Sequence, residues 1–161
     1  MREVMMAELE GIKACVPFDM DTVTALPRIG LEKGDRVAII CIMGDSVGAV
    51  VDLTLKQHTA ITAGTSKDLA TSNPYYKKVG AATSFTKVTP VAEAANYVLS
   101  TDFAAQEGVV VFEVLGEELD NEGGYGFVSV AAADSTVVGK ILSVLYVLRN
   151  VRFLPAYKLD L

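Results

Sequence analysis

His58 is the only histidine in the chain, so a Ser-His-Asp arrangement would have to use it, and a histidine-rich metal site is excluded. It stands where an alternating apolar and polar run gives way to a polar segment. We therefore expect a histidine at a strand end or on the surface, and not a catalytic base. Cys15 and Cys41 lie far apart and form no Cys-x-x-Cys pair, so the cysteines indicate neither a zinc site nor a disulfide framework.

Four carboxylates crowd into one short segment: Glu117, Glu118, Asp120 and Glu122. Carboxylate oxygens bind hard cations such as Ca²⁺, so a metal site is one interpretation of this segment. The spacing does not match the calcium-binding loop of EF-hands, in which the ligands and the turn glycine occupy set positions. The pattern favours a solvated acidic turn.

Two glycine-rich segments and one basic aromatic segment complete the candidates. Gly123-Gly124-Tyr125-Gly126 leads into a strand pattern, whereas loops that bind phosphate lead into a helix. Gly44-Asp45-Ser46-Val47-Gly48 lacks the lysine of a P-loop, so both segments predict tight turns. Tyr75-Tyr76-Lys77-Lys78 has the composition of a single-strand binder, but a segment anchored by a buried ring is the better interpretation. We assign no catalytic, cofactor-binding or metal-ligating residue and expect a protein that is not an enzyme.

Composition limits the partners of the chain. The 161 residues are 51% hydrophobic and 21% charged, which predicts one folded domain. The net charge of -6 argues against binding to nucleic acid or to an anionic membrane. Residues 1–8 include acidic residues that a signal peptide lacks, and the apolar run 137–148 is too short to span a bilayer. We expect a soluble, unsecreted product that folds in a reducing cytosol.

The clearest element lies at residues 51–57, where apolar and polar residues alternate. This period places Val51, Leu53 and Leu55 on one face of a strand. Residues 36–43 form a short apolar run typical of a strand that is buried on both faces. The turn residues 44–46 between these runs predict a β-hairpin.

The remaining segments predict further short strands. We expect a surface loop over 58–78 with a short strand at 60–63, and a helical turn at 92–95 after Thr89-Pro90 that leads into a strand. Residues 137–153 fit either a helix or a strand, and β-branched and aromatic residues favour the strand. That strand would place Leu142, Val144, Tyr146 and Leu148 on one face. The other predicted strands are 81–88, 108–115 and 125–130, with a polar turn at 117–124.

Together these segments predict an all-β protein with one short helix possible. We expect a β-sandwich or jelly-roll-like single domain over 34–161, preceded by an N-terminal arm or edge segment over 1–33 with an edge strand at 12–16. If residues 137–153 were helical, an α+β sandwich built of β-α-β units would be the alternative.

The order of several motifs resembles the small structural proteins in the virions of tailed bacteriophages. In that group a hydrophobic strand is followed by an alternating strand, an acidic Glu-Leu-Asp turn precedes a Gly-Phe strand, and an aromatic strand closes the domain. The matching segments are residues 34–39, 51–57, 85–88, 110–114, 118–120, 126–130, 143–148 and Arg152-Phe153.

The resemblance covers roughly residues 34 to 155. It implies a head-associated protein made in the host cytoplasm, most simply a capsid decoration or cement protein on the virion surface. The implied partner is the major capsid protein, with self-association, for which a trimer is the expectation. The segment 58–78 is longer than usual in the group, and residues 1–33 have no counterpart, so a head–tail joining role stays open.

Two other classes remain as alternatives. A shell-forming subunit of the microcompartment type requires helices at 46–57 and 136–148, and circular dichroism would detect them. A small hydrolase or carbohydrate-binding β domain requires a pocket that joins His58 or a carboxylate pair with aromatic rings. The chain has no tryptophan, which disfavours a sugar-binding platform.

Overall fold

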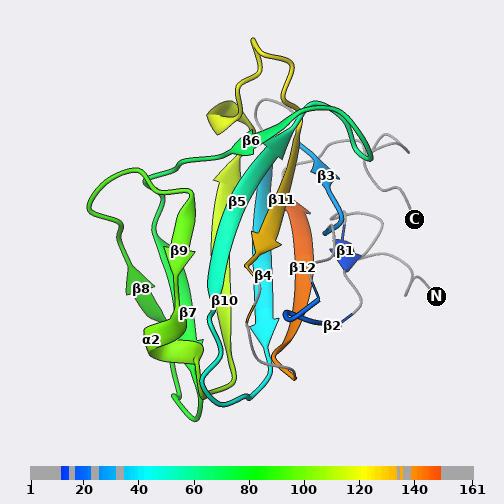
Figure 1. Cartoon of the computed structure of the whole chain (residues 1–161). Helices are drawn as coiled ribbons and strands as arrows, with labels where there is room; N and C mark the ends of the chain where they lie inside the picture. The colour runs from blue at the N-terminus through cyan, green and yellow to red at the C-terminus, as the bar shows by residue number, and fades with distance from the viewer. Residues whose placement is uncertain are drawn as a thin grey trace, which may run out of the picture.

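The computed structural model describes residues 12–14, 17–22, 26–31, 35–133, 135 and 139–149. Their strands form two antiparallel sheets that pack face to face, so the all-β, sandwich-like single domain is confirmed. Figure 1 shows the five-stranded sheet, with β5 and β11, in front of the seven-stranded sheet, with β4, β10 and β12. Among the described residues, the helical segments are all too short to cross a bilayer.

The seven-stranded sheet has the order β1-β12-β4-β10-β7-β8, and β2 also pairs with β12. Its strands are β1 (Ile12–Ala14), β2 (Phe18–Asp19), β4 (Arg36–Met43), β7 (Tyr75–Val79), β8 (Thr86–Val88), β10 (Gly108–Leu115) and β12 (Ile141–Arg149). The strand interpretation of the last segment is therefore confirmed. The β-α-β alternative fails at both required helices, because β5 and β12 occupy those segments.

The five-stranded sheet has the order β3-β11-β5-β6, and β9 pairs with the first half of β5. Its strands are β3 (Ile29–Gly30), β5 (Asp52–His58), β6 (Ser66–Asp68), β9 (Asn96–Val98) and β11 (Phe127–Ala132). Two short helical segments, α2 (Ser100–Phe103) and the 3₁₀ turn η1 (Gly116–Glu118), flank β10.

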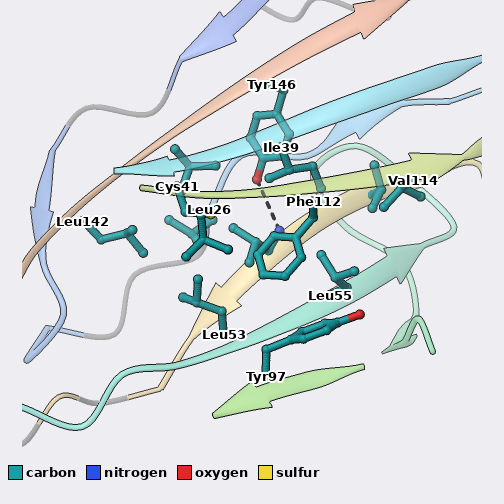
Figure 2. Packing of buried hydrophobic residues seen from close by; sticks show 14 of the residues in the cluster. Leu26, Ile39, Cys41, Leu53, Leu55, Tyr97, Phe112, Val114, Leu142 and Tyr146 are labelled. Atoms are coloured by element: carbon teal, nitrogen blue, oxygen red, sulfur yellow. Dashed lines mark hydrogen bonds between the residues drawn. The ribbon is translucent and has the colours of Figure 1, made fainter. Parts of the chain in front are cut away.

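The core lies between the sheets and follows the alternation of the strands. Val51, Leu53 and Leu55 are fully buried, as the alternating run predicts. Phe112 of β10 projects between the sheets toward Tyr97 of β9, as Figure 2 shows. The four β12 residues predicted to share a face are also buried; they are Leu142, Val144, Tyr146 and Leu148. The Tyr146 hydroxyl accepts a hydrogen bond from the Val130 amide of β11 at 3.3 Å, which links the two sheets.

Four local predictions are wrong. β4 and β5 do not form a hairpin, because β4 pairs with β10 and β12 in one sheet while β5 lies in the other. β4 is buried on one face only, and Ile42 on the other face is 48% exposed. Residues 60–63 form bends, with the strand at β6, and the helix lies at α2 and not at 92–95.

The described parts of residues 1–33 contribute to both sheets. β1 and β2 pair with β12, and β3 pairs with β11. Met20 and Ile29 are buried in the core. The division of the chain at residue 33 stays a prediction, and β1 lies within the expected edge strand.

Candidate functional site

The segments 59–74 and 116–126, here called the apical loops, meet at the end of the sandwich where β5 and β10 finish. Figure 1 shows the 116–126 loop projecting from this end beside β6. The apical loops contain most of the predicted surface loop and the whole predicted acidic turn. The structure therefore joins two features that lie about fifty residues apart in the sequence.

Glu118 ties one apical loop to the other. Its carboxylate accepts hydrogen bonds from Thr71 Oγ1 at 2.6 Å, from Asn73 Nδ2 at 2.9 Å and from the Leu115 amide at 2.7 Å. Asn73 Nδ2 also donates to the Glu113 carbonyl at 3.2 Å. Charge-assisted bonds of this kind are stronger than neutral ones, so this end of the sandwich is a braced surface.

Asp120 makes a second connection between the loops. Its carboxylate accepts from Lys67 Nζ at 2.5 Å and from the Gly123 amide at 2.9 Å, and its own amide donates to Gln57 Oε1 at 2.9 Å. The hydrogen bond from Lys67, aided by Gly123, lowers the pKa of Asp120. Lys67 Nζ also lies 4.4 Å from the centre of the Tyr125 ring.

These contacts define the structural role of the acidic segment 117–122. The carboxylates of Glu118 and Asp120 face separate sets of donors, while Glu117 and Glu122 are exposed. Within the described ranges, no three side chains of the metal-ligating types converge on a common point. The segment links the two apical loops through Glu118 and Asp120, and it carries two exposed carboxylates at its tip.

Arg28 holds the first turn of the other apical loop. Its Nη1 donates to the Ala60 carbonyl at 2.7 Å and to the Ala63 carbonyl at 2.6 Å. The Thr59 and Thr65 backbones close the turn, and Gly64 adopts a φ of +83°. Sequence reasoning placed Arg28 in an arm and missed this contact, since it joins residues more than thirty positions apart.

His58 ends β5, as expected, but its side chain is only 5% exposed. Its Nδ1 lies 2.6 Å from Ser66 Oγ and its Nε2 lies 2.8 Å from Ser129 Oγ. Burial, reinforced by the charges of Arg28 and Lys56, lowers the pKa of His58 to about 4. Both ring nitrogens therefore serve a neutral structural link from β6 across β5 to β11.

The lowered pKa predicts that the protein loses stability in mild acid. The unfolded chain binds a proton at His58 near pH 6.5, whereas the folded chain resists protonation until about pH 4. The free energy of unfolding should fall as pH decreases through this window, by up to about 3 kcal/mol from this group. Urea unfolding at several pH values measures this, and His58→Asn should flatten the slope between pH 6.5 and pH 4.5. Equal slopes for the two proteins would contradict the assignment.

The basic aromatic segment 75–78 lies on β7 and divides between two faces. Tyr75 packs inward, with its ring centre 5.3 Å from that of Tyr97 and 5.6 Å from that of Phe112. Tyr76 is 38% exposed on the opposite face, and Lys77 forms an ion pair with Asp102 at 2.5 Å. The two tyrosines therefore make no shared stacking platform, and the prediction of an anchored ring fits Tyr75.

The glycine segments and Cys41 have structural roles. Gly124 takes a φ of +79° in a turn, as predicted, whereas Gly48 takes a φ of +75° in a bend of the β4–β5 connection. Cys41 is a free thiol inside the core, and burial raises its pKa to about 12. It is therefore not a thiolate at neutral pH. Cys15 lies outside the described residues.

The most buried charge in the described residues is one that sequence reasoning missed. Lys140 is fully buried, and its Nζ donates to the carbonyls of Gly44, Phe103 and Gln106. Burial lowers its pKa, and the Asp45 carboxylate opposes that effect. Lys140 thereby fastens the β4–β5 connection to the segment after α2.

Comparisons with protein-family models, with curated proteins and with solved structures each find no match for this chain.

Proposed function

We propose that this chain is a structural protein of a tailed-bacteriophage virion, a decoration or cement subunit that binds the major capsid protein at the capsid surface. It is made in the host cytoplasm and stabilises the assembled shell without catalysis. The ordered motifs that resemble such proteins fall on β4, β5, β10 and β11 and on the β12 segment. A homo-oligomer, expected from the resemblance to be a trimer, belongs to the same proposal.

The braced apical loops carry the proposal. A cement protein needs a contact surface that keeps its shape, because ordering a loose loop on binding lowers affinity. Glu118 and Asp120 fix the two loops to each other before any partner binds. Many copies on a symmetric shell add avidity, so each contact can be modest.

Binding to capsid shells tests this function. Shells assembled without the chain are mixed with purified protein and pelleted, and the bound copies are counted. Glu122→Lys, at the exposed tip of the apical loops, should weaken binding about tenfold because it reverses a charge at the contact. Glu107→Lys makes the same change at the opposite end of the sandwich, where it is also exposed, and should bind normally. Wild-type protein that stays in the supernatant, or equal binding by both variants, argues against the proposal.

A further inference from the structure

The outer face of the seven-stranded sheet, which points away from the core, is unusually apolar. Ile42 is 48% exposed and Tyr76 is 38% exposed on this face, and their apolar neighbours are half-buried. We define the outer apolar patch as Ile40, Ile42, Tyr76, Val109, Val111 and Leu145. An antiparallel sheet with one solvated face normally places polar residues there.

The strand register makes the patch continuous. Leu145, Ile40, Val111 and Tyr76 pair in one row across β12, β4, β10 and β7. Paired residues of antiparallel strands project to the same face, so four apolar side chains lie side by side. Ile42 and Val109 pair in the next row on this face. Soluble monomers rarely leave apolar patches of this extent uncovered.

Opposite charges flank the patch at its two edges. Lys78 pairs with Val109 on the β7 side. Asp19 pairs with Ile141 on the β2 side, and Asp21 is exposed beside it. Both charged edges lie toward the same end of the sheet, where β4 ends and β10 begins. A two-fold axis parallel to the strands exchanges the edges and places Lys78 of one copy opposite the acidic edge of another.

We propose that two copies of this chain dock face to face through the outer apolar patch, about a two-fold axis parallel to the strands. The contact is isologous, since each copy contributes the same residues. It repeats the aligned packing of two sheets that forms the core of each copy. The proposal does not depend on the virion function, and it leaves the apical loops free. It replaces the trimer that the resemblance implies with a dimer, so the mass of the protein in solution decides between the two.

The size of the face suits a stable dimer. With strands about 4.8 Å apart and about 3.3 Å per residue, the strands β4, β7, β10 and β12, which have 8, 5, 8 and 9 residues, cover about 480 Å² of flat area. Projecting side chains enlarge the accessible surface toward the roughly 800 Å² that each partner contributes to a standard interface. The charge pattern favours a second copy over an anionic partner, because the acidic edge with Asp19 and Asp21 would repel an anion that Lys78 attracts. A second copy offers both charges.

Sedimentation velocity with light scattering tests the dimer. The wild type at about 100 μM should have twice the monomer mass, and the monomer is 17.1 kDa. Ile40→Lys places an unpaired charge at the centre of the patch and should raise the dimer dissociation constant at least about 100-fold. Thr54→Lys makes a matched change on the outer face of the other sheet and should leave the dimer intact. Circular dichroism verifies that both variants fold.

A charge exchange gives a second test that does not disturb the patch. Lys78→Glu and Asp21→Lys should each weaken the dimer about fivefold, and the double variant should recover most of the loss. A monomeric wild type, a trimer, or a dimer that survives Ile40→Lys overturns the proposal. If Ile40→Lys fails to fold, the absence of recovery in the double variant overturns it instead. Capsid pelleting with Ile40→Lys separates this result from the virion function, since the apical loops are unchanged.

Discussion

Replacing Phe112 with alanine should lower the free energy of unfolding by about 4 kcal/mol, within the range for large aromatic residues removed from a core. Phe112 is 2% exposed, and its ring centre lies 4.7 Å from that of Tyr97. Because Phe112 belongs to one sheet and Tyr97 to the other, the ring joins the two layers (Figure 2). Truncation leaves a cavity between sheets that cannot close without moving β10.

Chemical unfolding followed by circular dichroism measures the effect of this substitution. Phe85→Ala is the matched control, since it removes the same side chain from a position that is 49% exposed. We expect this control to cost less than about 1 kcal/mol. Similar losses for the two variants would mean that Phe112 does not join the sheets as described.

The sequence predicted the strands whose buried faces alternate. Residues 108–115 coincide with β10, and the alternation around Leu53 identified the buried face of β5. At β12, β-branched residues and Tyr146 correctly favoured a strand over a helix. Such patterns are local, because the side-chain period of a strand is set by its own backbone.

Pairing between strands was not predictable in the same way. The turn residues 44–46 indicated correctly that the chain turns, but not that it crosses to the other sheet. The same turn residues occur whether the next strand pairs with the previous one or enters the opposite sheet. Which of the two happens depends on the side chains that the two strands bury against the rest of the core. The helix was misplaced because Thr89-Pro90 has helix-start chemistry, whereas α2 begins only at Ser100.

The sequence predicted the two segments that form the candidate site, but it did not predict the contacts between them. The sequence identified the loop after His58 and the acidic turn separately, and nothing local indicated that Glu118 accepts from Thr71 and Asn73. Partners that lie more than thirty residues apart leave no periodic signal in one sequence. The same reason explains why Arg28 and Lys140 were missed.

Lys140→Met should destabilise the fold by about 3 kcal/mol, because three carbonyls lose their donor at about 1 kcal/mol or more each. Methionine is close to lysine in length and shape but donates no hydrogen bond. The carbonyls of Gly44, Phe103 and Gln106 would lose a donor together. A buried carbonyl without a partner costs about 1–3 kcal/mol. The bond to Phe103 is buried and the other two are part-buried, so we expect the summed loss to lie toward the lower end and still to exceed the gain from burying a methionine.

Lys56→Met provides the comparison, because Lys56 forms a partly exposed ion pair with Asp68. Exposed pairs contribute about 0–1 kcal/mol, so this variant should unfold close to the wild type. Hydrogen exchange adds a local readout, since the segments held by Lys140 should open before the rest of the core. Equal stability of the two variants would show that water or neighbouring amides satisfy the three carbonyls. Selective opening at Gly44 and after α2 is expected instead, because the buried ammonium donates hydrogen bonds to both segments.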